Sequence, residues 1–234
     1  MNKQSNVYTT IYIIILVVLV GTALALTSLS LKDRQQANSD NDKRKQILAS
    51  INVTAGSPEA VITEFDKYIT GQLVVNENGD SIGDNAFGVD IANQSKVAPA
   101  DRQLPIYICD IDNSRKYIIP LYGAGLWGPI WGYISLNDDC STVYGAFFDH
   151  QGETPGLGAE ITKDDFRNQF SGKTIFKGDN FLPIAVVKTG QVPGGQEDYV
   201  NGISGGTITS KGVGAMLDNC LSPYRNYLDN LRKK

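Results

Sequence analysis

The first part of the chain is a long apolar run. No charged residue occurs between positions 4 and 31, and the centre of this stretch reads IYIIILVVLV. A helix of about 20 apolar residues is long enough to cross the hydrocarbon core of a bilayer, so residues 1–31 are predicted to contain a transmembrane helix. The alternative is a cleaved signal peptide, because Ala23-Leu24-Ala25 resembles a cleavage site. We favour an uncleaved anchor, since the apolar stretch is long and Lys3 is the only charged side chain before it.

Polar residues replace the apolar run from position 32. The segment KDRQQANSDNDKRKQ, residues 32–46, is polar throughout and indicates a solvated stalk. A helix is then predicted after Ser57, which can cap it, with Pro58 at the first helical position and Glu59 in the first turn. The apolar face of this helix is expected to carry Val61, Ile62, Phe65 and Tyr68 or Ile69.

Beyond position 104 the pattern becomes mainly that of strands. Short β-branched and aromatic runs are bounded by Gly, Pro, Asn or Asp; these runs are 106–111, 116–122, 130–136, 142–148 and 184–187. A short helix is expected to open at Thr162, and a C-terminal helix over 210–231 should be kinked or split by Pro223. The predicted fold class is α+β: an N-terminal transmembrane helix, then one domain over 47–234 with a mostly antiparallel curved sheet flanked by a few helices.

Length and charge narrow the possible functions. A chain of 234 residues allows one ordinary domain with an appendage. Residues 1–45 carry six basic and three acidic side chains, whereas residues 46–234 carry 15 basic and 22 acidic ones, a formal charge of -7. An acidic body lacks a surface that could follow phosphates, so nucleic-acid binding is not expected.

The counts of metal-ligating residues are low. Three cysteines without CxxC spacing exclude a four-thiolate iron–sulfur cluster, and a single histidine excludes a two-histidine metal motif. We therefore predict no metal site. If the protein carries electrons, its carrier must be largely organic.

One glycine-rich segment resembles a dinucleotide site. Gly123-Ala-Gly125-Leu-Trp-Gly128 matches GxGxxG, but a strand-like run follows it, whereas a Rossmann site requires a helix at that point. A hairpin turn is the better interpretation. Leu126 and Trp127 would then lie at a turn where they could cover an aromatic ligand, although Trp127 could equally belong to the core.

A second segment resembles the nucleophile elbow of a hydrolase. Gly202-Ile-Ser204-Gly-Gly206 matches GxSxG, and such an enzyme needs a histidine as base. The only histidine, His150, precedes the serine instead of following it, and the parallel strand–helix alternation of α/β-hydrolases is absent. A serine hydrolase is therefore a minor alternative.

A third cluster, residues 150–158, reads HQGETPGLG. His150 and Glu153 could pair as acid and base or bind a metal, but a metal site here would lack ligands. The plainer interpretation is a polar turn whose glycines let the backbone approach a flat ligand. We assign no catalytic residue.

These three segments together, behind one N-terminal span, resemble the FMN-binding C subunit of the sodium-translocating NADH:quinone reductases. The G subunit of the Rnf complex is a related protein. The resemblance covers essentially the whole chain and implies a membrane-anchored electron-transfer subunit of a sodium-pumping NADH:quinone reductase, which itself binds neither NADH nor quinone. It implies as partners the other subunits of that complex, a flavin transferase and the lipid bilayer.

The resemblance also implies a cofactor and its attachment. Family members carry FMN bonded covalently through its phosphate to the threonine of a pattern like D-G-x-S/T-G-A-T, and the corresponding run here is Asn201-Gly-Ile-Ser-Gly-Gly-Thr207. Thr207 would thus carry the phosphoester. Asn201 and Gly206 depart from the pattern, and Asn201 lacks a charge that a transferase would read. The other implied cofactor-binding residues are Ser204, Gly205, Gly206, Ile208, Thr209, Leu126, Trp127, Glu153, Thr154, Gly156, Leu157 and Gly158.

The local pattern agrees with an anion at this position. Thr207 is expected just before the C-terminal helix, where unpaired N–H groups and the helix dipole favour negative charge. Gly205 and Gly206 would let the backbone approach the phosphate closely. Thr209 or Ser210 is expected to cap the helix, as an alternative to flavin contact.

Charge pattern and resemblance disagree about orientation. Five basic residues follow the apolar run within residues 32–45, so the positive-inside rule alone keeps the domain in the cytoplasm. The resemblance implies a single-pass protein of the bacterial inner membrane with a cytoplasmic start and a periplasmic flavin domain. We follow the resemblance, because a long domain can translocate despite flanking charge. The main alternative function is a membrane-tethered binding module without a redox role.

Overall fold

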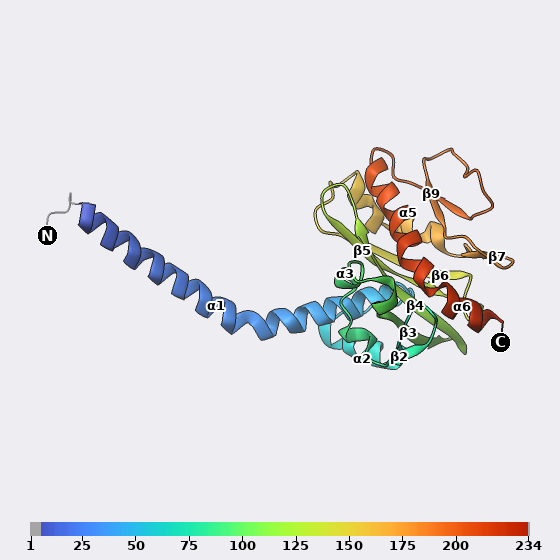
Figure 1. Cartoon of the computed structure of the whole chain (residues 1–234), viewed down its shortest axis with the longest axis horizontal. Coiled ribbons are helices and arrows are strands. Elements are labelled where there is room, and N and C mark those ends of the chain that lie inside the picture. The colour runs from blue at the N-terminus through green and yellow to red at the C-terminus, as the bar shows by residue number, and fades with distance from the viewer. Residues whose placement is uncertain (1–5, 234) are drawn as a thin grey trace. The chain divides into compact units, whose positions relative to one another are not determined.

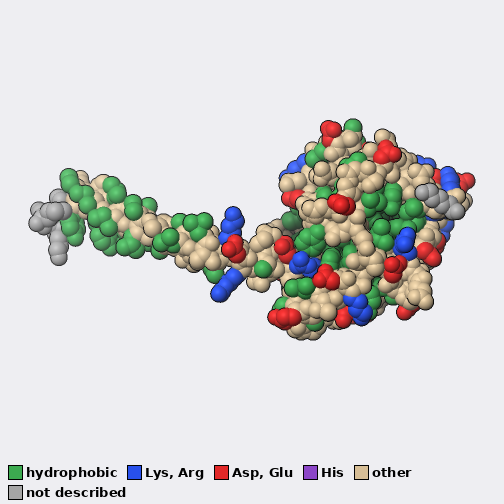
Figure 2. All heavy atoms as spheres, turned by 90° about the horizontal axis from the view of Figure 1, so that it is seen from below, with side chains coloured by type: hydrophobic (Ala, Val, Ile, Leu, Met, Phe, Trp, Pro, Cys, Tyr) green, Lys and Arg blue, Asp and Glu red, His purple; other side chains and the backbone are tan. Residues whose placement is uncertain are grey.

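The computed structural model describes residues 6–233, so what was expected of residues 1–5 lies outside the described part. The chain divides into two compact units, Met1–Lys43 and Arg44–Lys234. The first unit is formed by the helix α1 (Asn6–Ala49), whose end belongs to the second unit. Its apolar part reaches a mean hydropathy of 2.5 and is long enough to cross a membrane. Figure 2 shows its hydrophobic side chains in green, up to the first charged ones.

The predicted stalk is helical. Residues 32–46 continue α1 without a break, rich in Lys, Arg and Gln, which form helices readily. The side chains also support one another at i,i+4 spacing, as where the Gln36 amide donates to Asp40 at 2.8 Å. The boundary between membrane span and stalk stays a prediction.

The second unit is built on one six-stranded sheet in the order β2-β1-β3-β4-β5-β6, in which every neighbouring pair is antiparallel (Figure 1). Its strands are β1 (Ile69–Val75), β2 (Ser81–Gly83), β3 (Leu104–Ile111), β4 (Ser114–Ala124), β5 (Pro129–Leu136) and β6 (Val143–His150). Two short pairs accompany it: β7 (Phe176–Lys177) with β8 (Asn180–Phe181), antiparallel, and β9 (Ala185–Val187) with β10 (Tyr199–Asn201), parallel. The predicted α+β class with a mostly antiparallel sheet is confirmed.

Side chains alternate along each strand, so each face of the sheet carries an apolar layer. Helices cover both layers. On β4, Tyr117 and Ile119 pack into one layer and Ile118 into the other. The first layer is closed by α5 (Thr207–Leu221), which packs on β4. The second is closed by the end of α1 and by α2 (Pro58–Tyr68).

Several helices are short. They are α3 (Ile91–Gln94), α4 (Asp164–Arg167), α6 (Arg225–Arg232) and the 3₁₀ turns η1 (Ala86–Gly88), η2 (Pro99–Asp101), η3 (Gly158–Thr162), η4 (Asn168–Phe170) and η5 (Ser222–Tyr224). As predicted, Pro223 splits the C-terminal helix: α5 ends at Leu221 and α6 begins after η5.

The start of α2 matches its sequence signals, but its face does not match fully. Ser57 caps the helix by accepting from the Ala60 N–H at 3.2 Å. Val61 and Phe65 are buried, whereas Ile62 is exposed, because a residue beside Val61 points about 100° away from it around the helix. The short helix expected at Thr162 begins instead at Asp164, without a side-chain cap.

Helix α5 begins earlier than predicted. It starts at Thr207 with Gly206 as N-cap, so Thr209 and Ser210 lie inside its first turn and neither caps it. The Ser210 hydroxyl accepts from the Ile203 N–H at 2.8 Å and thereby holds the preceding loop. The sequence pattern placed the start late because Thr and Ser are better known as caps than as first-turn residues.

Candidate functional site

The first part of the candidate site is the hairpin turn between β4 and β5. The Gly125 N–H donates to the Gly128 carbonyl at 2.8 Å, which closes the turn and confirms the hairpin interpretation of the GxGxxG segment. Leu126 and Trp127 lie at its tip and are 47% and 67% exposed. Trp127 is therefore not a core residue; its contact with an aromatic ligand stays a prediction.

The second part follows β6. The turn after Thr154 is closed by the Leu157 N–H, which donates to the Thr154 carbonyl at 3.1 Å, and Gly156 adopts a φ of 76° that favours glycine. Leu157 is 42% exposed. Glu153, at the base of this turn, is buried, and its own N–H donates to His150 Nδ1 at 3.1 Å.

The third part is the loop that leads into α5. Gly205 has a φ of 76°, and the Gly206 N–H donates to the Ile203 carbonyl at 3.0 Å. The loop delivers Thr207 as the first residue of a 15-residue helix, and its N-cap brings no side chain to satisfy the helix N–H groups. Thr207 is exposed and Thr209 is buried.

These three parts meet around one cavity of about 230 Å³. Of the 13 residues predicted to contact a cofactor, 11 line it: Leu126, Trp127, Glu153, Thr154, Leu157, Gly158, Gly205, Gly206, Thr207, Ile208 and Thr209. Ser204 and Gly156 do not line it. Ser204 precedes the glycines of the loop, and Gly156 bends the turn that presents Leu157.

Glu153 is the one acidic side chain of this cavity. Its carboxylate accepts from the Trp127 N–H at 2.8 Å and from the Thr209 hydroxyl. Burial opposes its ionisation, but these two donors, the Leu126 N–H and the nearby His150 outweigh burial and lower the pKa of Glu153 below its ordinary value. The sequence indicated Glu153 as a flavin contact. The hydrogen bonds by which it joins separate segments became visible only in the structure.

The hydrolase alternative loses its support. His150 accepts from the Glu153 backbone through Nδ1, and within residues 6–233 no hydrogen bond joins it to Ser204. The sheet is antiparallel, unlike the parallel sheet on which a nucleophile elbow is built. Within the same residues no group of three His, Cys, Asp or Glu could hold a metal ion.

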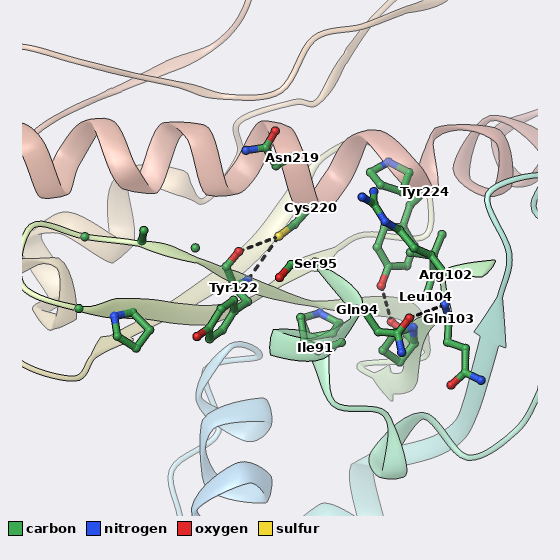
Figure 3. A pocket seen from close by; sticks show the side chains of 18 residues that line it. Ile91, Gln94, Ser95, Arg102, Gln103, Leu104, Tyr122, Asn219, Cys220 and Tyr224 are labelled. Carbon is green, nitrogen blue, oxygen red and sulfur yellow. Dashed lines mark hydrogen bonds between the residues drawn. The ribbon is translucent and has the colours of Figure 1, made fainter. Parts of the chain in front are cut away.

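A larger cavity of about 700 Å³ lies between the second half of α5 and strands β3 and β4 (Figure 3). The sequence did not predict it. Its walls include Pro105, Pro120, Pro129 and Pro223. The Cys220 thiol there accepts a hydrogen bond from the Tyr122 N–H and donates one to the Tyr122 carbonyl, both at 3.3 Å. It borders the same hairpin turn through Gly125 and Gly128 but contains none of the exposed apolar side chains of the smaller cavity.

Comparisons of sequence point to one family. The model of the FMN-binding domain matches residues 125–222, which contain all three parts of the site. The C subunit of the Na(+)-translocating NADH-quinone reductase from Vibrio anguillarum is 31% identical over 232 residues, covering 91% of this chain and 89% of that protein. The same protein from Vibrio alginolyticus is 32% identical with equal coverage.

Solved structures agree. The C subunit from Parabacteroides distasonis is 50% identical, has a TM-score of 0.79, and is matched over 96% of its length and 85% of this chain. NqrC from Shewanella oneidensis, at 22% identity and a TM-score of 0.68, shares the fold over 84% of this chain.

Proposed function

Because the chain belongs to the NqrC family, the C subunits of the Na(+)-translocating NADH-quinone reductases, we propose that it carries one FMN, bonded through its phosphate to Thr207, and passes electrons between partners within that complex. The chain is a subunit of an oxidoreductase complex and contains an FMN-binding domain. Attachment, anchoring and electron transfer are the proposed parts.

The start of α5 carries the proposal for the phosphate. Thr207 is exposed at the first position of a helix whose glycine N-cap offers no side-chain acceptor. The first N–H groups of such a helix have no partner within the helix, and its dipole favours an anion. A phosphoester on Thr207 Oγ1 would therefore satisfy groups that the chain itself leaves open. Side chains at positions 205 and 206 would crowd this space, since a Cβ on Gly206 would lie 3.2 Å from the Gly158 N.

The apolar side chains fit a flat ring. Of the seven large hydrophobic residues exposed between Arg44 and Lys233, four line this cavity: Leu126, Trp127, Leu157 and Ile208. Complete small-molecule pockets start at about 300 Å³, so this one would enclose a flavin only in part and leave an edge open to a redox partner. When bound, FMN supplies reversible acceptance and release of electrons. The chain orients the ring, shields one side and keeps water from it.

Anchoring and partners complete the proposal. Helix α1 would span the bacterial inner membrane once, with the flavin domain in the periplasm. The partners would be the other subunits of the reductase, the surrounding lipid, and a flavin transferase that attaches FMN to Thr207.

The mass of the intact protein tests the attachment. The full chain and its Thr207→Val and Ser204→Ala variants are expressed with a flavin transferase and Mg²⁺, and each is weighed. Wild type and Ser204→Ala should gain one FMN residue, about 440 Da from the cofactor's own formula. Thr207→Val should gain none, because valine keeps the branched shape but has no oxygen. A flavinylated Thr207→Val protein, or an unmodified wild type, would overturn the proposed attachment.

A further inference from the structure

We infer that Glu153 is a positioning residue of the flavin site: its carboxylate holds the Trp127 turn against the start of α5 and disfavours added negative charge on the flavin ring. This inference rests on the proposed function. It concerns the redox properties of the cofactor and not its attachment, so the two can fail separately.

The geometry supports the positioning role. One carboxylate accepts from the backbone of Trp127 in the β4–β5 turn and from the Thr209 hydroxyl in the first turn of α5. Glu153 itself belongs to the turn after β6, the second part of the site, so the three parts of the cavity are joined through one side chain. Thr209 lies two residues after the proposed attachment point. Movement of this carboxylate would therefore shift both the ring cover and the phosphate anchor.

The surroundings are shaped around this carboxylate. A Cβ added to Gly125 would meet Glu153 Oε1, and one added to Gly158 would meet Glu153 Oε2 and the Thr209 hydroxyl. At both glycines the missing side chain therefore leaves room for the Glu153 carboxylate. Glu153 is 5% exposed, and within residues 6–233 it has no Lys or Arg partner in an ion pair.

A carboxylate without a Lys or Arg partner leaves its charge acting on the cavity that it lines. His150 and Glu160 are the other titratable groups on its turn; His150 bonds the Glu153 backbone, and Glu160 accepts from the Gly156 N–H at 2.9 Å. In a site that is partly shielded from water, a carboxylate several ångströms from a second negative charge raises the free energy of that charge. The oxidised ring is neutral, whereas reduction adds negative charge to it. Glu153 thus favours the oxidised form.

Sulfite binding measures this effect without turnover. Sulfite adds the electron pair of its sulfur to a ring nitrogen of oxidised flavin, forming an S–N bond and leaving one negative charge on the ring; nothing departs. The full chain in detergent, flavinylated and checked by mass, is titrated with sulfite and the loss of visible absorbance is followed. Glu153→Gln should bind sulfite on the order of tenfold more tightly than wild type, and the midpoint potential of the flavin should rise.

Two further variants separate charge from shape. Glu153→Asp keeps the charge on a shorter side chain and should keep sulfite affinity within about threefold of wild type. Glu160→Gln removes a carboxylate from the same turn that does not line the cavity and should behave as wild type. Glu153→Gln is expected to fold, because its amide can accept from the Trp127 N–H and donate to the Thr209 oxygen.

The outcomes are decisive either way. Parental sulfite affinity in a flavinylated Glu153→Gln protein would overturn the inference, and so would an Asp variant that binds sulfite as tightly as the Gln variant is expected to. Should Glu153→Gln fail to fold, the Asp variant still decides the charge effect, since tenfold tighter binding there would contradict it. A wild type without FMN would instead contradict the proposed function.

Discussion

Trp127 and Leu157 are exposed residues of a kind that folded domains usually bury. At 67% and 42% exposure they contribute little to the core, so replacing either with alanine should change the free energy of unfolding by less than about 0.5 kcal/mol. Both should keep covalent FMN, because neither touches the attachment point. The fluorescence of the flavin should change in both variants, since an apolar cover is lost.

The other tryptophan is the matched control. Trp131 is half-buried and its ring N–H donates to Gln46 at 3.2 Å, away from the cavity. Trp131→Phe should lower stability and leave flavin fluorescence unchanged. Parental fluorescence in both Trp127→Ala and Leu157→Ala would show that these side chains do not cover the ring.

Glu153 predicts a pH dependence of stability. Its pKa in the folded protein lies below the ordinary 4.5, because the hydrogen bonds it accepts outweigh its burial. Such a group stabilises the fold above pH 4.5, and this contribution is lost as the pH falls through the folded pKa. At pH 7 the free energy of unfolding of wild type should exceed that of Glu153→Gln by about 1–2 kcal/mol, the difference between hydrogen bonds to a charged and to a neutral group.

The measurement is urea unfolding of both proteins from pH 7 to pH 3. The gap between them should narrow as the pH falls below 4.5. Asp139 and Asp198 also have lowered pKa values because hydrogen bonds outweigh their burial, but they are present in both proteins and cancel in the difference. A gap that stays constant over this range would contradict an ionised Glu153.

At the scale of residues, the sequence identified the members of the cavity but not how they are connected. Glycines and the exposed Leu126 and Trp127 were recognisable because a turn motif and a family resemblance coincide there. The bond between Glu153 and Thr209 joins positions 56 residues apart, and nothing in local spacing predicts such a pair. Likewise, Thr209 or Ser210 was predicted as a possible cap of the helix, whereas the Ser210 hydroxyl accepts from the Ile203 N–H in the loop before it.

At the scale of elements, α5 connects the site to the sheet and makes its two inner glycines unequal. A Cβ on Gly214 would meet Val186 at 3.6 Å, an ordinary contact, so Gly214→Ala should raise the free energy of unfolding by about 0.5–1 kcal/mol. A Cβ on Gly212 would run into the Ala124 carbonyl. Gly212→Ala should therefore push α5 away from β4 and lower stability by about 1–3 kcal/mol.

Denaturant unfolding followed by circular dichroism compares the two variants directly. Because α5 begins with Thr207, Gly212→Ala should also slow the attachment of FMN, whereas Gly214→Ala should not. Equal effects of the two substitutions on stability would mean that α5 does not pack closely on β4.

Elements with a clear period were predictable, and their ends were less so. Four strands of the sheet, β3 to β6, appear within two residues of their predicted bounds, because β-branched runs between turn residues leave few alternatives. No bounds were predicted for β1 and β2. The stalk was predicted but its helical conformation was not, because a polar helix has no apolar stripe that would indicate it. The start of α5 was predicted too late because Gly-Gly-Thr is typical of a loop. The helix begins there without a side-chain cap, so the sequence carries no capping signal at Gly206.

At the scale of the whole molecule, the orientation across the membrane is the open prediction. Protease added to spheroplasts of a Gram-negative host should digest the chain beyond residue 46, because we expect the flavin domain in the periplasm. An antibody to the C-terminus follows the loss of the full-length band, and a cytoplasmic protein serves as the control for intact cells. Complete protection, with digestion only after lysis, would reverse the orientation.

The order of the strands has a consequence for how the protein matures. From β3 to β6 each strand pairs with the next through a short turn, whereas α5 reaches β4 across a long separation, as where Cys220 bonds to Tyr122 98 residues away. Closing long loops loses more chain entropy, so distant contacts form late in folding. We expect strands β3 to β6 to assemble first and the cavity lined by Thr207 to form last. A transferase that recognises the folded cavity would then modify only fully folded domains, and the presence of covalent flavin would indicate that folding is complete.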